Sequence, residues 1–290
     1  MIYIVTPVYN RKTFTQNYLK ALEEQTVKDF KVIIVDDGST DGTSEMIEQE
    51  FPNVILLKEK GDLWWSAATN IGIEYAKKQN ATYIMTLNDD TVPTSNYMEE
   101  MIKTAKEHPK ALLGAFAIDA DTEKAIFAGE NLHWNSCSFH NVLDTLPKEA
   151  PLTGLQEVNL FPGRGLLIPI EVFNTIGMYD AKNFPQTVAD LDFTARAFNA
   201  GYKIYCNLNA KIKIYPEESG GVGIRKNKSW KNYYLHLFGM RGAGNIKWFA
   251  KFSLKNTPKK YLIQCLTIGT TRRIVGYLRD WAKESYNERK

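Results

Sequence analysis

The sequence lacks several features that would define its class directly. Its three cysteines, Cys137, Cys206 and Cys265, are far apart and form no C-x-x-C pair. Their odd number and spacing predict reduced thiols in a cytosolic compartment. No window offers the roughly 18 uninterrupted apolar residues that a membrane-spanning helix needs. Strand-like sequence starts at Ile2, so we expect no signal peptide in front of it and a cytoplasmic protein.

Two nucleotide-binding motifs are absent as well. The chain contains no G-x-x-x-x-G-K-[ST], which argues against a P-loop. It also has no G-x-G-x-x-G between the first predicted strand and the first predicted helix, which argues against a dinucleotide site of the Rossmann type. A nucleotide would therefore have to be recognised by other residues.

Acidic residues are scarce in the C-terminal part of the chain. Residues 224–290 contain 16 Lys and Arg against 3 Asp and Glu, whereas the rest of the chain contains 20 against 30. The net charge of +3 therefore hides an acidic body with a basic tail. This asymmetry suggests two partners of different charge.

Segments of strand and helix character alternate early in the chain. Periodicity predicts strands at 2–5, 31–35, 54–57 and 83–87, and helices at 13–25, 43–51, 66–78 and 95–107. This order predicts an α/β fold with a mostly parallel central sheet flanked by helices. Ligands in such sheets bind beyond the carboxyl ends of the strands. Later segments predict a strand at 111–118, hairpin-like pieces, and helices at 170–176, 187–200 and within 230–290.

Acidic clusters follow two of these strands, in VDDGSTDGT (35–43) and LNDDT (87–91). One interpretation is structural, because Asp and Gly suit strand-to-helix turns and Asp, Ser or Thr can cap the next helix. The other is that the carboxylates bind ligands. One could accept a hydrogen bond from a base N–H, and Asp89 and Asp90 could contact a sugar hydroxyl and a hard cation. Two acidic strand ends in one parallel sheet favour the second interpretation.

A third acidic segment is TVADLDFTARAFNAG (187–201). Thr187 and Asp190 have the spacing of a helix capping box, and Asp192 precedes Arg196 by four residues, which predicts an ion pair within the helix. This structural interpretation accounts for both aspartates. The alternative gives Asp190 a chemical role.

Together these segments resemble the family-2 inverting glycosyltransferases of the GT-A fold. IVTPVYNR (4–11) is similar to that family's first strand and turn, VDDGSTDGT to its nucleotide-binding sequence, NDD (88–90) to its D-x-D metal motif, and ADLDFTARAFNAGYKI (189–204) to its E-D-x-D-x-x-x-R segment. The likeness covers residues 2–92 and 160–205. GDLWWSAATNIGI (61–73) and FPGRGLLIP (161–169) are similar to a bacterial polysaccharide subgroup that includes many rhamnosyltransferases.

The resemblance implies a role for each matching residue. Asp37 would recognise the nucleobase, Asp89 the ribose or sugar, and Asp90 an Mn2+ or Mg2+ ion. The second residue of the E-D-x-D-x-x-x-R segment is the family's catalytic base, which is Asp190 in this chain. Further contacts to the nucleotide sugar would come from Pro7, Tyr9 and Asn70.

Two positions depart from the family pattern. Asn88 replaces the first aspartate of D-x-D, although Asp89 and Asp90 remain for metal binding. Ala189 replaces the glutamate before the base. The loss of that acidic group favours one alternative, a non-catalytic carbohydrate- or membrane-binding protein on the same fold. A nucleotidylyltransferase is a second alternative, but TPVYNRKTF (6–14) contains no glycine, whereas those enzymes open with a Gly-rich, lysine-containing loop.

Trp64, Trp65 and Arg164 are candidates for contacts to the acceptor or the sugar. Flat aromatic faces suit the C–H surfaces of sugars. Paired tryptophans also anchor cores, so we expect one of the two at the site. Arg164 lies between two glycines, where backbone can approach closely and a guanidinium can meet a phosphate. The alternative for Arg164 is a solvated turn arginine.

The basic tail has three candidate roles. Trp248, Phe249 and Phe252 alternate with lysines at helix-like spacing, which favours contact with an anionic membrane surface. The tail could instead form a solvated helical cap on the domain. Nucleic acid is a third candidate, because charge alone does not distinguish polyanions, but we expect no nucleic acid partner.

The residues and the resemblance together predict a metal-dependent glycosyltransferase of bacterial cell-surface polysaccharide synthesis. It would move a hexosyl or rhamnosyl group, with inversion, from a nucleotide-diphosphate donor to a hydroxyl of a glycan or lipid-linked acceptor. Residues 1–110 would form the nucleotide-sugar-binding half, and residues 111–223 the acceptor-binding half, of one catalytic domain. Residues 224–290 would form a basic helical extension that contacts the inner face of the plasma membrane.

Overall fold

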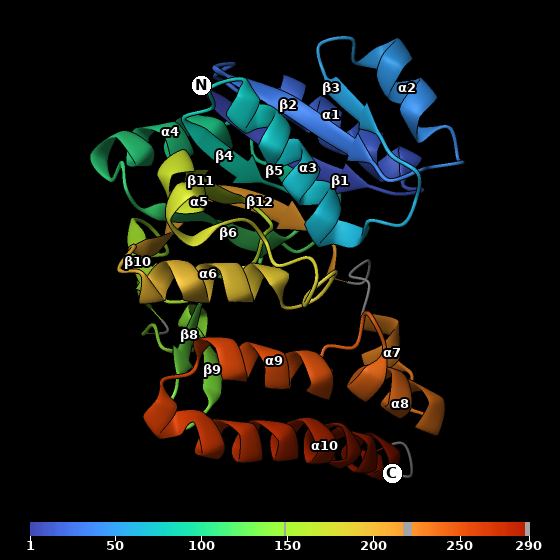
Figure 1. Ribbon diagram of the computed structural model, residues 1–290, viewed down its shortest axis with the longest axis vertical. Coiled ribbons are helices and arrows are strands. Elements are labelled where there is room, and N and C mark those ends of the chain that lie inside the picture. The colour runs from blue at the N-terminus through green and yellow to red at the C-terminus, as the bar shows by residue number, and fades with distance from the viewer. Residues whose placement is uncertain (148, 217–221, 288–290) are drawn as a thin grey trace.

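A large sheet with helices packed around it forms one end of the molecule, and the C-terminal helices gather at the other (Figure 1). The computed structural model describes residues 1–147, 149–216 and 222–287. The strands are β1 (Ile2–Val8), β2 (Phe30–Asp36), β3 (Ile55–Lys58), β4 (Tyr83–Thr86), β5 (Thr91–Pro93), β6 (Leu112–Asp119), β7 (Ala125–Phe127), β8 (Glu130–His133), β9 (Ser138–Asn141), β10 (Leu155–Val158), β11 (Leu166–Pro169) and β12 (Ile204–Ile214). The helices are α1 (Lys12–Glu23), α2 (Thr43–Glu50), α3 (Trp64–Lys78), α4 (Tyr97–Glu107), α5 (Ile170–Ile176), α6 (Ala189–Asn199), α7 (Val222–Lys226), α8 (Trp230–Phe238), α9 (Ile246–Asn256) and α10 (Leu262–Asn287), with short 3-10 turns at Val142–Asp144 and Lys259–Tyr261.

The strand order of the main sheet is β10-β12-β6-β11-β4-β1-β2-β3, with β5 paired to β12 and β7 to β6. Strands β1 to β4 pair in parallel, and β12 is parallel to β6. Strand β11 lies antiparallel between β4 and β6. The predicted mostly parallel sheet flanked by helices is therefore confirmed, and the carboxyl ends of β1, β2 and β4 meet at one edge.

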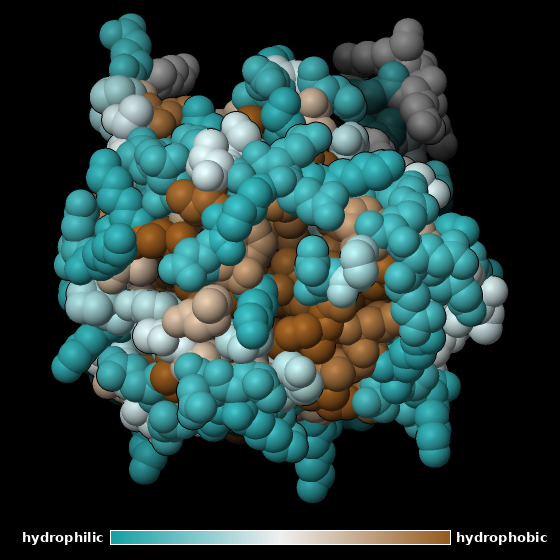
Figure 2. All heavy atoms as spheres, turned by 90° about the horizontal axis from the view of Figure 1, so that it is seen from above, coloured by the Kyte–Doolittle hydropathy of each residue, from teal (hydrophilic) through white to brown (hydrophobic). Residues whose placement is uncertain are grey.

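Apolar side chains cover both faces of this sheet. Helices α1 and α4 bury residues such as Tyr18 and Met98 against one face, whereas α3, α5 and α6 bury residues such as Ile73, Phe173 and Phe193 against the other. Helix spacing of three or four residues makes this burial one-sided. Seen from above, the surface is largely hydrophilic, and apolar residues gather in a hollow of that face (Figure 2).

Strands β5, β11 and β12 are not among the predicted elements. Strand β12 has 11 residues, yet asparagines and lysines interrupt its apolar residues, and a register shift between Asn207 and Lys211 breaks its alternation. The buried Asn207 amide donates to the Thr104 hydroxyl (2.9 Å) and to the Glu100 carbonyl (3.2 Å). The tertiary structure therefore satisfies polar groups that weaken the strand signal in the sequence.

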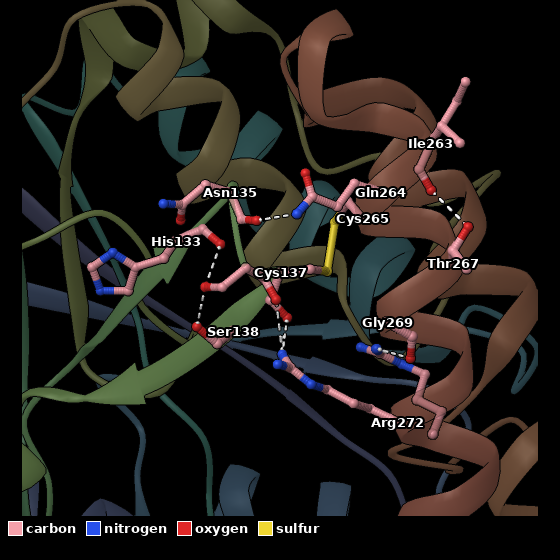
Figure 3. Close-up of a disulfide and its surroundings, with 12 residues drawn as sticks. His133, Asn135, Cys137, Ser138, Ile263, Gln264, Cys265, Thr267, Gly269 and Arg272 are labelled. Atoms are coloured by element: carbon pink, nitrogen blue, oxygen red, sulfur yellow. Dashed lines mark hydrogen bonds between the residues drawn. A yellow bond between two sulfur atoms is a disulfide. The ribbon is translucent and has the colours of Figure 1, made fainter.

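The prediction of three reduced cysteines is wrong for two of them. Cys137 and Cys265, which are 128 residues apart, form a disulfide that ties the segment between β8 and β9 to α10 (Figure 3). Cys206 on β12 is free and buried. Folding brings the paired cysteines together, so their spacing in the sequence does not predict the disulfide. The cysteine content therefore gives no support to a reducing compartment.

The tail caps the domain through α9. Trp248 and Phe252 belong to the main core, and Phe249 packs beside the disulfide. The expectation that these three aromatic side chains face a membrane is therefore wrong, because all are buried. No helix in the described part of the chain has both the length and the apolar character to cross a bilayer. The last residues of the predicted helical region, 288–290, lie outside the described residues.

Candidate active site

A pocket of about 600 Å³ opens beyond the carboxyl ends of β1, β2 and β4. This is where a parallel sheet is expected to bind its ligand. Seven of the predicted site residues line the pocket: Pro7, Tyr9, Asp37, Trp64, Trp65, Asp89 and Asp90. The structure thus brings together residues from four separate turns.

Asp36 and Asp37 hold the turns on which the pocket is built. The Asp36 carboxylate accepts hydrogen bonds from the Ser39 N–H (2.8 Å) and the Ser44 hydroxyl. The Asp37 carboxylate accepts bonds of 3.0–3.2 Å from the backbone N–H groups of Gly61, Leu63 and Trp64. Asp37 therefore fixes the start of α3 while it faces the pocket.

Arg11 links the two aspartates of the NDD segment. Its Nε lies 3.1 Å from the Asp89 carboxylate, and its Nη2 lies 3.9 Å from Asp90. The Thr15 hydroxyl also donates to Asp89 (3.2 Å). Burial raises the pKa of Asp89 to about 7 against the opposing charge of Arg11, and the Asp90 charge adds to the rise. Asp90 is more open, with 26% of its side chain exposed against 7% for Asp89.

The pocket does not offer enough side-chain ligands to hold a metal ion by protein groups alone. Among residues 1–147, 149–216 and 222–287, no group of three or more His, Cys, Asp or Glu side chains could bind a metal ion. Adjacent carboxylates at a pocket do fit Mn2+ or Mg2+, since such ions are commonly held by one or two carboxylates with water and phosphate oxygens as the other ligands. Asp90 is the more accessible carboxylate of the pair.

Asp190 lies at the start of α6, beside the Trp65 wall of the pocket. Its carboxylate accepts hydrogen bonds from the backbone N–H groups of Gly163 (3.0 Å) and Leu191 (2.9 Å). A Cβ added to Gly163 would lie 2.6 Å from the Trp65 ring and 3.6 Å from the Asp190 Cβ, so Gly163 lies close to both residues. Burial raises the pKa of Asp190, while the two N–H groups and the charge of Arg164 oppose the rise.

The predicted capping box at Thr187 and Asp190 is wrong. Helix α6 begins at Ala189, and its N-cap is Val188, which makes no side-chain cap. The Thr187 hydroxyl instead donates to the Met240 carbonyl (3.5 Å). Val188 has a φ of 71°, which is costly for a β-branched residue, and such backbone strain clusters at functional sites.

Asp192 has the structural role that the sequence predicts. It is fully buried, and its carboxylate lies 2.9 Å from Arg196. The same carboxylate accepts from Lys255 (2.9 Å) and Asn256 (2.9 Å) of α9. Two aspartates on one helix therefore differ in their surroundings. Neither lines the pocket, but Asp190 lies beside Gly163, which contacts the Trp65 ring, whereas Asp192 pairs with α9.

Arg164 and Glu130 extend the charged group around Asp190. The pKa of Glu130 is raised by burial and by the Asp190 charge, and Arg164 opposes that rise. Glu130 lies on β8, far in sequence from α6, so no motif or periodicity selects it. It supplies an acidic group near Asp190 although Ala189 carries none.

Both tryptophans line the pocket, although one was expected. The Trp65 indole N–H donates to the Asn88 side-chain oxygen (3.1 Å), and its ring meets Tyr179 edge to face at 5.1 Å. Trp64 is exposed and has a positive φ of 59°. Trp65 is thus a fixed wall, while Trp64 is free to contact a ligand.

The predicted residues Asp190 and Arg164 do not line the pocket, and neither does Asn70. Its side-chain amide makes paired hydrogen bonds with the Tyr179 backbone, at 2.8 and 3.1 Å, which gives it a structural role. Six other polar residues line the pocket without having been selected as site residues: Arg11, Asp62, Asn88, Gln186, Thr187 and Arg241. Arg241 comes from the connection between α8 and α9, and only its place in the basic tail could have suggested it.

Comparisons with known sequences identify the family. A model described as glycosyl transferase family 2 matches residues 3–152. The N-acetylglucosaminyl-diphospho-decaprenol L-rhamnosyltransferase of Mycobacterium tuberculosis is 24% identical over 237 residues, which cover 75% of this chain and 77% of that protein. Glycosyltransferase GlyA of Streptococcus pneumoniae is 28% identical over 109 residues, which cover 37% of this chain and 15% of GlyA. The chain likewise matches only 36% of the length of glycosyltransferase GlyG of the same species.

Solved structures agree at the level of the fold. TarS of S. aureus, residues 1–349, has a TM-score of 0.58 at 12% identity, with 96% of this chain and 91% of that chain covered. GalNAc-T7, solved with UDP, GalNAc and Mn2+, has a TM-score of 0.62 at 12% identity, with 99% and 57% covered. These likenesses confirm the expected GT-A architecture. The family model matches more than half of this chain, and the chain therefore belongs to glycosyl transferase family 2.

Proposed function

We propose that the protein is an inverting glycosyltransferase that moves a sugar from a nucleotide diphosphate to an acceptor hydroxyl. The observation that supports this most directly is the pocket at the strand ends. It combines a buried and an accessible carboxylate, Asp89 and Asp90, with an aromatic wall, Trp65, behind which Asp190 lies. A donor with a charged diphosphate and a flat sugar matches those groups.

The donor would lie with its nucleotide near the β1 and β2 turns. Tyr9 and Pro7 line that side of the pocket beside Asp37, so the base would pack there against the turn that Asp37 organises. Arg11 and Arg241 also line the pocket, and their guanidinium groups suit phosphate oxygens. An Mn2+ or Mg2+ ion held by Asp90, when bound, would supply positive charge to the leaving diphosphate.

Asp190 would act as the general base. As the acceptor hydroxyl attacks the anomeric carbon, its proton passes to the Asp190 carboxylate, a new C–O bond forms, and the bond to the diphosphate breaks on the opposite face. The raised pKa of Asp190 makes the carboxylate a stronger base. Arg164 and the Gly163 N–H oppose that rise, which keeps the group ionised before it accepts the proton.

We base the proposed sugar and acceptor classes on a relative. The mycobacterial relative is named as a rhamnosyltransferase acting on a diphospho-linked lipid. We propose a hexosyl or rhamnosyl donor and a glycan or lipid-linked acceptor in bacterial cell-surface polysaccharide synthesis. Trp64 is the side chain placed to contact the sugar or the acceptor, because it is exposed at the pocket.

A panel of nucleotide sugars tests this function. The correct donor should raise the melting temperature in the presence of Mn2+ and should then release nucleoside diphosphate when an acceptor is added. Stabilisation by a nucleoside triphosphate with release of pyrophosphate would identify a nucleotidylyltransferase instead. Binding of sugars without any turnover would favour the non-catalytic alternative.

We also propose peripheral contact with an anionic membrane, through α8 rather than α9. Trp230, Tyr234 and Phe238 recur every four residues on α8 and are 71%, 63% and 54% exposed. Lys231 on the same helix is an exposed cation. Exposed aromatics beside basic residues suit the interface of an anionic bilayer.

Replacing all three α8 aromatics with Ser should remove most membrane binding. The intact protein should sediment with phosphatidylglycerol vesicles, less at high salt because charge attraction is screened. The triple variant should lose about 10³-fold or more of its affinity, since each exposed aromatic contributes ~1.5–3 kcal/mol when buried and ~1.4 kcal/mol is a factor of ten. The matched control is Phe198→Ser with Tyr215→Ser, two partly exposed aromatics on other elements. Equal binding to neutral and anionic vesicles would contradict the electrostatic part of this proposal.

A further inference from the structure

A second pocket, of about 390 Å³, lies among the C-terminal helices. It shares no lining residue with the donor pocket. Its walls come from α7, α8 and α10 and from the segment beside the disulfide. Four cationic side chains line it, Arg225, Lys228, Arg272 and Arg273. Among the described residues, Asp280 is the only carboxylate in the lining.

The positive charge of this pocket is not matched by its own acidic groups. Asp280 lies 3.6 Å from Arg279, and Lys228 lies 3.5 Å from Glu284, outside the lining. Arg225 is exposed, and its side chain makes no hydrogen bond or ion pair with any residue that the structure describes. A surplus of cations therefore faces the cavity.

Arg273 and His236 lie within this group of positive charges, and the pKa of each is lowered. Arg273 stacks on the Phe249 ring at 3.5 Å and donates to the Gly269 carbonyl (3.1 Å), with no carboxylate partner among the described residues. Burial lowers the pKa of Arg273 to about 10. Burial also lowers the pKa of His236, and the charges of Arg225, Lys228 and Arg273 add to that effect. The Nδ1 of His236 is buried without a hydrogen-bond partner.

The pocket is held in shape by contacts that leave its centre open. Arg272 extends from α10 to the backbone oxygens of Ser136 (3.0 Å) and Cys137 (2.9 Å), next to the disulfide (Figure 3). On the opposite side, the Tyr277 hydroxyl donates to the Ile224 carbonyl (3.2 Å). Arg272 and Arg273 are thus held in position before any ligand arrives.

We propose that this pocket binds a phosphate or diphosphate group. Guanidinium groups match phosphate oxygens in shape and charge, and an anion would give the unpaired cations and the His236 ring the partners that the protein does not supply. A cavity of this volume admits a diphosphate with part of its substituent. Soluble phosphate compounds and the headgroup of a phospholipid share this chemistry. The inference does not depend on the proposed transferase activity.

Titration calorimetry with inorganic pyrophosphate in EDTA tests the site. Arg225→Ala should weaken binding about tenfold or more, the usual effect of losing a charge-assisted hydrogen bond, and adding Arg272→Gln should weaken it further. Arg225 is exposed and its side chain has no partner among the described residues, so its loss should leave the melting temperature unchanged. Lys103→Ala with Lys106→Ala, two exposed lysines on α4, is the control for net charge and should bind normally.

Two further experiments test where pyrophosphate binds and whether the natural ligand is a lipid headgroup or a soluble phosphate compound. Arg241→Ala, which changes the donor pocket, should bind pyrophosphate like the native protein. Vesicles of phosphatidylcholine with and without phosphatidic acid identify the source. Loss of the phosphatidic acid preference in the Arg225 variants indicates a lipid headgroup, and its retention indicates a soluble phosphate compound. Absence of pyrophosphate binding by the native protein, or equal binding by the Arg225 variants, overturns the proposal.

Discussion

Asp190→Asn should lose most sugar transfer while the protein stays folded and binds its donor. Asparagine keeps the shape of the side chain and still accepts the Gly163 N–H, which lies 3.0 Å from the carboxylate, but it cannot take a proton from the acceptor. The rate of nucleoside diphosphate release at saturating donor should fall ~10²–10⁴-fold, the usual contribution of a general base. Donor affinity measured by calorimetry should be unchanged.

Asp192→Asn is the matched control for this variant. Asp192 is fully buried and pairs with Arg196 and Lys255, so removing its charge leaves Arg196 without a carboxylate partner and Lys255 with Asp180 alone. Breaking a buried pair costs ~3–5 kcal/mol of unfolding free energy, whereas turnover per folded molecule should persist. If Asp190→Asn behaved like Asp192→Asn, with a lower melting temperature and normal turnover per folded molecule, its role would be structural.

The pH dependence provides an independent check on Asp190. A base works only when ionised, so the rate should fall as the pH decreases through its pKa. Burial raises the pKa of Asp190, and the acidic limb of the rate profile should therefore lie above the ordinary aspartate value of about 4. An acidic limb at or below that value would argue that another group accepts the proton.

The early half of the fold could be predicted because its signals are local. Strands such as β1 and β2 are continuous apolar runs followed by polar turns, and parallel pairing then brings those turns to one edge of the sheet. The positions of Asp37, Asp89 and Asp90 at one pocket follow from this topology. The ligand-binding interpretation of the two acidic strand ends is consistent with that result, while the roles of the individual residues stay predictions.

The remaining features depend on contacts between distant segments. The Cys137–Cys265 disulfide joins residues 128 positions apart, and Arg241 reaches the pocket from the connection between two tail helices. Trp248 and Phe252 look like membrane anchors in a basic helix, yet the apolar core takes them because α9 packs on α6. Asn70 matched a family segment, but its amide pairs with the Tyr179 backbone. No periodicity or motif distinguishes these outcomes.

Asp90→Ala should remove the metal dependence of donor binding without unfolding the protein. The Asp90 side chain is 26% exposed, and its nearest charged partner, Arg11, is 3.9 Å away, so few stabilising contacts are lost. Asp89 is a poorer choice, because its buried carboxylate holds Arg11 and Thr15, and replacing it would disturb the pocket itself.

Calorimetry of the donor with and without Mn2+ measures this effect. In the native protein Mn2+ should strengthen binding, and in Asp90→Ala that gain should fall about 10²-fold, because loss of one partner of a desolvated charge pair costs ~2–5 kcal/mol. Asp62→Ala is the matched control, since Asp62 is an exposed carboxylate that also lines the pocket but lies outside the NDD segment. Equal metal dependence in the native protein and in Asp90→Ala would exclude Asp90 as the ligand. An equal loss in Asp90→Ala and Asp62→Ala would instead assign the effect to the overall negative charge of the pocket. Both variants remove one negative charge, but only Asp90 is proposed to contact the ion.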